Sequence, residues 1–150
     1  FTSGNLLLTY DGNDGSSVLD PTGLGGVDLT QLGANTGVFL RATSDLGSIL
    51  TFTIYTDATH FSTASIAIAA DPTFTFQDYF TPFTSFAAGG VGGADFTSVG
   101  AISLLLNGAT QGTDVSLETV VAAPTPVPEP TGALLIAAAG LFFHLRRRNR

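Results

Sequence analysis

The chain has 150 residues and a formal net charge of −7, and it contains no cysteine. This length allows one domain and a tail, and the lack of cysteine excludes disulfides and thiol chemistry. Before Val127 a single Arg stands against eleven acidic residues, which gives −10 and excludes binding of nucleic acid by charge. Because these acids are spread singly along the chain, the pattern indicates solubility.

The part before the linker, residues 1–121, is predicted to be rich in β-strands. Short β-branched and aromatic runs alternate there with Gly, Asp, Asn and Pro. The clearest strand is predicted at residues 48–56, where Leu50, Phe52 and Ile54 alternate with Thr and Tyr and share one face. Further strands are predicted at residues 5–10, 38–43, 64–70, 73–77, 100–106 and 113–121.

The connecting segments are predicted from their turn residues. Residues 11–15 form a turn, residues 20–37 a loop with at most a short strand, and residues 87–93 a flexible glycine-rich loop. Seven or eight short strands at this spacing predict a mainly β domain, an antiparallel β-sandwich over residues 1–121. We prefer a jelly-roll-like sandwich, because such domains often end in a long pair of strands.

The acidic turn contains candidate calcium ligands. Asp11, Asn13 and Asp14 could offer the hard oxygens that Ca²⁺ prefers. The spacing is too short for an EF-hand, and Thr22 stands where the closing Glu would fall. An ordinary turn is therefore the favoured interpretation, and no cofactor is expected beyond such a structural Ca²⁺.

An aromatic cluster follows the middle of the chain. Phe is mostly a core residue and the chain has no Trp, so core packing is the favoured interpretation. A sugar-stacking face is the alternative, for which Tyr79 and Phe83 are the candidate residues. The cluster comprises Phe74, Phe76, Tyr79, Phe80, Phe83 and Phe86.

No catalytic constellation is recognisable in the sequence. There is no Gly-x-Ser-x-Gly elbow, and His60 is the only histidine before the tail. His60 is expected in a loop or at a strand end, without a catalytic or metal role. A glycosidase would need two carboxylates at a set spacing, and the sequence pairs no two of them.

The C-terminal segment places three signals in a fixed order. Residues 122–127 form a Pro-rich linker, expected to be extended. Pro128-Glu129-Pro130 follows within segment 128–150, and then a run without polar side chains that predicts one transmembrane-type helix over residues 132–145. The positions that mark this membrane segment are Gly132, Leu134, Leu135, Ile136, Gly140, Leu141, Phe142 and Phe143.

Four arginines close the chain, at Arg146, Arg147, Arg148 and Arg150. About 15 helical residues reach about 22 Å, short of a ~30 Å hydrocarbon core, and long Arg side chains can snorkel to the headgroups. By the positive-inside rule this end stays cytoplasmic and the domain lies across the membrane. The alternatives are a core helix that ends in arginines and a plain, uncut membrane anchor.

This tail resembles the PEP-CTERM sorting signal of Gram-negative bacteria. The matching residues are Val127, Pro128, Glu129 and Pro130, the apolar segment and the Arg cluster, about the last 24 residues of the chain. The resemblance implies recognition and cleavage by an exosortase, a membrane cysteine transpeptidase-like enzyme, and association with exopolysaccharide and the cell envelope. Residues 96–104 and 112–117 resemble the end of the β-sandwich domains that commonly precede this tail, which resemble carbohydrate-binding folds.

The sequence therefore predicts a non-enzymatic, exported envelope protein, structural or adhesive at the cell surface or in the extracellular matrix. Because export needs a signal, and neither an initiator Met nor a signal peptide is present, we expect a fragment or processed form. The expected partners are an exosortase-type enzyme, the inner membrane through the C-terminal helix, and exopolysaccharide, but not nucleic acid. A surface-displayed carbohydrate-binding module is the alternative, and a hydrolase is a third hypothesis.

Overall fold

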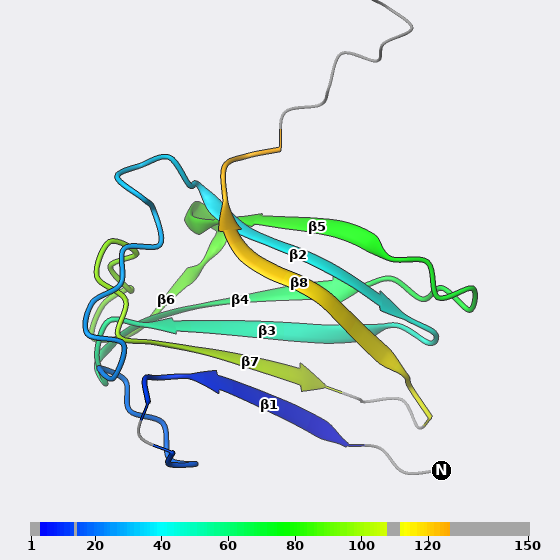
Figure 1. Cartoon of the computed structure of the whole chain (residues 1–150), viewed down its shortest axis with the longest axis horizontal. Helices are drawn as coiled ribbons and strands as arrows, with labels where there is room; N and C mark the ends of the chain where they lie inside the picture. The colour runs from blue at the N-terminus through cyan, green and yellow to red at the C-terminus, as the bar shows by residue number, and fades with distance from the viewer. Residues whose placement is uncertain (1–3, 14, 108–111, 127–150) are drawn as a thin grey trace, which may run out of the picture.

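The computed structural model describes residues 4–13, 15–107 and 112–126, which form two antiparallel sheets stacked as a β-sandwich (Figure 1). The larger sheet has the strand order β1-β7-β3-β4-β6, and the smaller has the order β5-β2-β8. The prediction of a mainly β, antiparallel sandwich is confirmed. The strands are β1 (Asn5–Tyr10), β2 (Gly37–Ser44), β3 (Ser48–Tyr55), β4 (His60–Ile68), β5 (Gln77–Pro82), β6 (Ala87–Gly90), β7 (Ala101–Asn107) and β8 (Val115–Ala123), with a 3₁₀ turn η1 (Phe83–Ser85) between β5 and β6.

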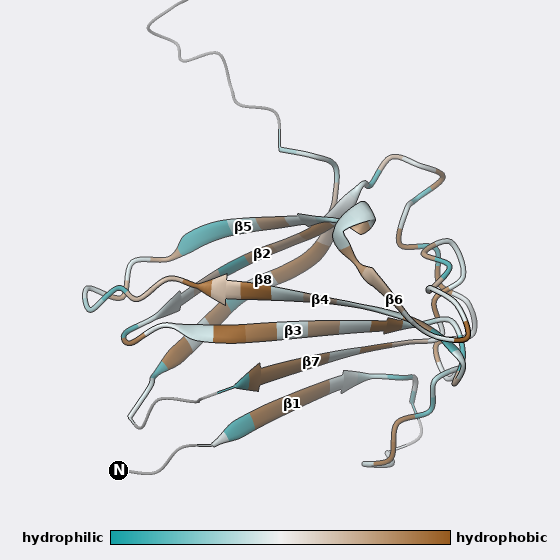
Figure 2. Ribbon diagram, turned by 180° about the vertical axis from the view of Figure 1, so that it is seen from behind, coloured by the Kyte–Doolittle hydropathy of each residue, from teal (hydrophilic) through white to brown (hydrophobic). Residues whose placement is uncertain are grey.

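The hydrophobic core lies between the two sheets. Strand β3 turns Leu50, Phe52 and Ile54 inward, and each of them is at most 1% exposed. Leu40 of β2 packs into the same core from the smaller sheet and is fully buried. Apolar stretches run along β3 and β7 in Figure 2. Burial of each such side chain stabilises the fold by roughly 1.5–3 kcal/mol, so this alternation is the main determinant of the sandwich.

Residues 73–77 do not form the predicted strand. The Asp71 carboxylate accepts hydrogen bonds from the N–H groups of Thr73 at 2.8 Å and Thr75 at 3.3 Å, which curls the chain into a turn. Phe74 adopts a φ of 57°, which is incompatible with a strand. Strand β5 therefore begins only at Gln77.

Three further segments differ from the predictions. Strand β4 spans His60–Ile68, so it begins and ends earlier than the strand predicted at residues 64–70. Residues 87–90 lie in the segment predicted as a flexible loop, but they form β6, which pairs with β4 from His60 to Thr63. Strand β8 continues to Ala123, two residues into the predicted linker, because Gly37 of β2 pairs with it there.

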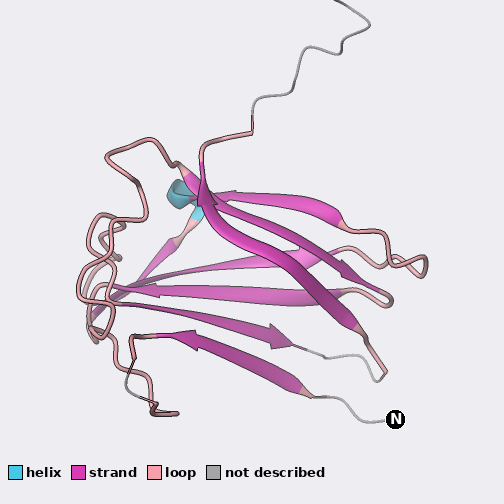
Figure 3. Ribbon diagram, viewed as in Figure 1, coloured by secondary structure: helices cyan, strands magenta, loops and turns pink. Residues whose placement is uncertain are grey.

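The loops gather mainly at one end of the sandwich. In the larger sheet, Tyr55 at the end of β3 pairs with Phe61 near the start of β4 and with Ala101 at the start of β7. Tyr10 at the end of β1 lies at the same edge, opposite Ile102. The described parts of loops 11–36, 56–59 and 91–100 therefore meet at one place, here called the loop end (Figure 3).

The predicted helix at 132–145 lies outside the described residues. Within residues 4–13, 15–107 and 112–126, no helix is long and apolar enough to cross a membrane.

Candidate functional site at the loop end

An Asp-x-Thr motif occurs five times in the described part of the chain. Four copies lie at the loop end, beginning at Asp20, Asp28, Asp57 and Asp95, and the fifth begins at Asp71 near the opposite end. In every copy one carboxylate oxygen accepts both the N–H and the hydroxyl of the Thr two residues later. Such local bonds define Asx turns, so these loops are built from turns that fix their own backbone.

These bonds lower the pKa of all five carboxyl groups. The largest cause is the Thr N–H for Asp20 and Asp57, and the Thr hydroxyl for Asp28, Asp71 and Asp95. Each donor stabilises the charged carboxylate over the neutral acid. The sequence pattern indicated that the acidic residues provide solubility. These five Asp residues therefore also stabilise the conformation of the loops.

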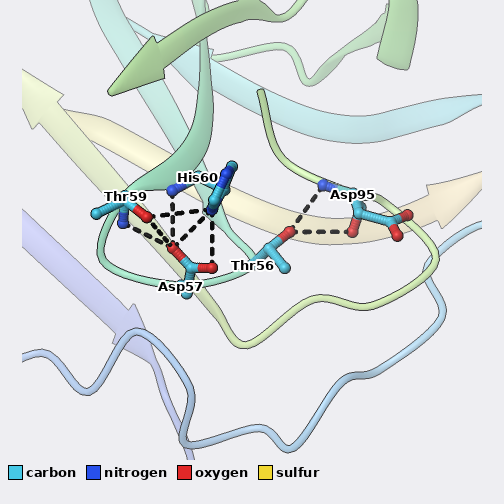
Figure 4. Close-up of polar contacts among 5 residues, drawn as sticks. All are labelled: Thr56, Asp57, Thr59, His60 and Asp95. Atoms are coloured by element: carbon cyan, nitrogen blue, oxygen red, sulfur yellow. Dashed lines mark hydrogen bonds and ion pairs between the residues drawn. The ribbon is translucent and has the colours of Figure 1, made fainter. Parts of the chain in front are cut away.

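The turn at Asp57 also holds the one described histidine (Figure 4). Both carboxylate oxygens of Asp57 lie within 3.0 Å of His60 Nδ1, and Oδ1 accepts the His60 N–H at 2.9 Å. Thr59 Oγ1 is 3.1 Å from the same ring nitrogen. As predicted, His60 stands at a strand end, where it begins β4.

This His–Asp pair differs from a catalytic triad in one geometric respect. In a triad the carboxylate orients Nδ1 while the nucleophile faces Nε2. Here the nearby hydroxyl of Thr59 and the carboxylate of Asp57 both face Nδ1 of His60. Both side chains are about half exposed, at 46% for His60 and 41% for Asp57, so their contact contributes little to stability. The cluster is thus organised as a turn.

Two loops of this end are joined by one hydroxyl (Figure 4). Thr56 Oγ1 accepts the N–H of Asp95 at 2.7 Å and donates to its carbonyl oxygen at 3.4 Å. A third loop joins at Gly100, whose carbonyl accepts the N–H of Leu24 at 2.8 Å while its own N–H donates to Tyr55 O at 2.7 Å. The three loops are therefore a single packed layer.

The candidate calcium turn is only partly described. Asp11 is buried, at 8% exposure, and its carboxylate accepts the N–H of Asp20 at 2.9 Å, whereas Asn13 is exposed. Asp14 lies outside the described residues. Over the three described ranges, no group of three or more His, Cys, Asp or Glu side chains could hold a metal ion. The buried Asp11 carboxylate thus stabilises the loop through its hydrogen bond to Asp20.

Tyr79 and Phe83, the candidate ligand face, both pack against the core cluster. Tyr79 lies opposite Leu40 on the inner face of β5, and its hydroxyl accepts the N–H of Ala69 at 3.1 Å. The Phe83 ring stacks on Phe96 with centroids 4.5 Å apart. The structure therefore gives both aromatic rings a packing partner, as the core interpretation expects.

The residues predicted for sorting and membrane insertion, from Val127 to Arg150, lie outside the described residues. Sequence reasoning missed the Asp-x-Thr turns, although the repeated spacing is readable in the sequence. Asx-turn chemistry was the signal that could have found them.

The comparisons with known proteins gave no match: no family model, curated protein or solved structure is similar to this chain.

We expect stability to fall on acidification below about pH 4, because the pKa of these five carboxyls is lower in the folded protein than in the unfolded chain. Their contribution is fully present above the unfolded pKa and is lost as pH falls through the folded pKa. Urea unfolding from about pH 5 to about pH 2 measures this slope. A variant with all five replaced by Asn keeps the oxygen acceptors and should show a shallower slope; an unchanged slope would contradict the assignment.

Proposed function

We propose that the chain is an exported, non-enzymatic envelope protein of a Gram-negative bacterium, sorted through a C-terminal PEP-CTERM signal. The observation that carries the proposal is the succession of Pro128-Glu129-Pro130, an apolar run and an Arg cluster in the sequence. An exosortase-type enzyme would recognise the motif while the apolar run is in the inner membrane. The domain then remains at the cell surface or in the extracellular matrix, with a structural or adhesive role.

The way the described domain ends is consistent with this proposal. Strand β8 stops at Ala123, whose carbonyl accepts the N–H of Thr36 at 2.9 Å. The hydroxyl of Thr125 is 2.7 Å from that of Thr36, so the chain just before Pro126 is held to the start of β2. The core residues of the described domain all precede Pro126, so we expect the sandwich to stay folded once the tail is removed.

The finer fold that we infer is jelly-roll-like. Early strands pair with late ones in both sheets, β1 with β7 and β2 with β8, which is the wrapping that brings the two ends of a chain together. The described residues form eight strands, which are divided between the two sheets.

The intact mass of the protein recovered from the envelope of its native host tests the sorting proposal. We expect a mass that has lost the tail at or near Pro128–Pro130. A full-length mass that still includes Arg150 would contradict cleavage and make the tail a permanent anchor.

Replacing Glu129 with Ala, or deleting the four terminal arginines, is expected to cause missorting, measured as loss of the protein from the surface fraction. The matched control is Glu118→Ala, the only other Glu of the chain, which lies on β8 against Arg41 at 2.8 Å. Normal localisation of both tail variants would overturn the role of the motif.

A carbohydrate-binding module is the alternative function. The observation that favours it is the rigid set of Asp-x-Thr turns at the loop end, since fixed carboxylates can accept hydrogen bonds from sugar hydroxyls. A polysaccharide pull-down with the full chain, compared with a Thr56→Val, Asp57→Asn double variant, tests this role. Equal retention of both proteins would exclude the loop end as the binding surface.

A further inference from the structure

In the described part of the chain the two sheets have four edge strands, and three of them carry features that discourage pairing with another chain. Strand β5 presents Asp78 and ends in Pro82. Strand β8 carries Glu118 at an irregularity in its pairing with β2. Strand β6 has only four residues and ends at Gly90 with a φ of 68°. Charge, proline, bulges and shortness are the usual protections of a sheet edge.

Strand β1 has none of these protections. Its sequence, Asn-Leu-Leu-Leu-Thr-Tyr, is uncharged and free of Pro and Gly, and it pairs with β7 in one unbroken register over all six residues. On its other side no strand of the described residues pairs with it (Figure 1). The edge therefore offers a straight row of backbone donors and acceptors.

Apolar side chains are exposed on both faces of this edge. Leu7 is 60% exposed on the outer face. Leu6 and Tyr10 lie opposite Leu106 and Ile102 on the inner face, yet they are 49% and 56% exposed. An added strand would remove water from both rows of side chains.

The distribution of charge also favours this edge as the place where two copies associate. The neighbouring strands β1, β7 and β3 contain no charged residue or histidine, whereas β2, β5 and β8 carry Arg41, Asp78 and Glu118. Copies of a domain with a charge of −10 before Val127 repel each other over most of their surface. The uncharged β1 side is where two copies can approach without that repulsion.

We propose that β1 pairs antiparallel with β1 of a second copy, which joins the two larger sheets into one continuous sheet. A two-fold axis makes such an edge complementary to itself, because each strand offers the same donors and acceptors to its mate. Residues directly opposite each other share a face, so the axis passes midway between one residue and the same residue of the second copy. A pairing of five residues from each strand places either Leu7 or Leu8 opposite its own copy.

The chain has no cysteine, so a single introduced thiol tests this register directly. Opposite residues of antiparallel strands have Cα atoms about 4.5–5.5 Å apart, within the range of a disulfide. With the full chain in a mild non-ionic detergent and oxidised glutathione, we expect Leu7→Cys or Leu8→Cys to form a disulfide dimer. The rate should be about tenfold or more above that of Ile49→Cys, because pairing raises the effective thiol concentration. Ile49 is a matched control, 50% exposed on β3 away from the edge.

A charge variant gives the second, independent measurement. Sedimentation velocity of the full chain should show dimers that Leu7→Lys converts to monomers and that Ile49→Lys leaves unchanged, with circular dichroism confirming that both variants fold. Three results would overturn the proposal: equal cross-linking of all three Cys variants, a wild-type monomer at high concentration, or association that Leu7→Lys does not alter. Cross-linking of Leu7→Cys in host cells to a species of a different mass would assign the edge to another protein.

Discussion

Replacing Gly100 with valine is expected to destabilise the domain by about 3 kcal/mol, a large fraction of the stability of a small protein. A Cβ atom at Gly100 would lie 2.2 Å from Pro21 O and 2.7 Å from Thr56 O. Both contacts are with backbone, so no side-chain rotation can relieve them. The variant must instead push loop 11–36 away from the end of β3, which breaks the packed layer of the loop end.

Chemical denaturation followed by circular dichroism measures this loss. The matched control is Gly4→Val, because no atom lies within 4 Å of a Cβ built at Gly4. We expect the control to change the free energy of unfolding by no more than about 0.5 kcal/mol. A Gly100→Val variant as stable as the control would show that the three loops are not locked together at this residue.

The elements that the sequence predicted well are those in which alternation and burial coincide. Strand β3 is the clearest case, because Leu50, Phe52 and Ile54 all face the core while the Thr residues between them face outward. Strand β1 was predicted with its observed bounds, since turn residues flank it. In both strands the local pattern and the tertiary environment favour the same conformation.

Strands β5 and β6 could not be predicted, because long-range partners define them. Strand β5 has no clear alternation, and its register follows from pairing with β2, where Tyr79 lies opposite Leu40. In β6, Gly89 suggested a flexible loop. The structure shows that a glycine is needed there for packing, because an added Cβ would lie 2.2 Å from the Phe61 ring. A glycine that admits a neighbouring ring and a glycine in a mobile loop look alike in a sequence.

The candidate site also combines local features, which the sequence pattern contains, with long-range contacts, which it does not. The Asp-x-Thr turns are local, so their chemistry is present in the sequence even though we first interpreted the acids as solubilising. The meeting of Thr56 with Asp95 is not local, because 39 residues separate them. The pairing of β3 with β7 and of β4 with β6 brings these two loops together, and the N–H of Val91 donates directly to the Thr59 carbonyl at 2.8 Å.

An aromatic trio connects the two sheets to the loop end. Phe86 is 9% exposed and meets Phe96 edge-on, with centroids 5.5 Å apart and planes at 74°. The Phe83 ring stacks on the same Phe96 ring, with centroids 4.5 Å apart. Because Phe96 is the central residue of the Asp95-Phe96-Thr97 turn, the trio anchors one loop of the loop end to the core.

Phe86→Ala is therefore expected to cost about 3–5 kcal/mol, from lost burial and the cavity that remains. Part of this cost is the edge-on contact with Phe96, since aromatic pairs contribute about 0.5–1.5 kcal/mol beyond their buried area. The matched control is Phe74→Ala, which removes the same atoms from a ring that is 39% exposed and should cost clearly less. Urea unfolding of both variants gives the comparison. If Phe86→Ala were no more destabilising than Phe74→Ala, the trio would not be part of the core, and the ligand-face interpretation of Phe83 would gain support.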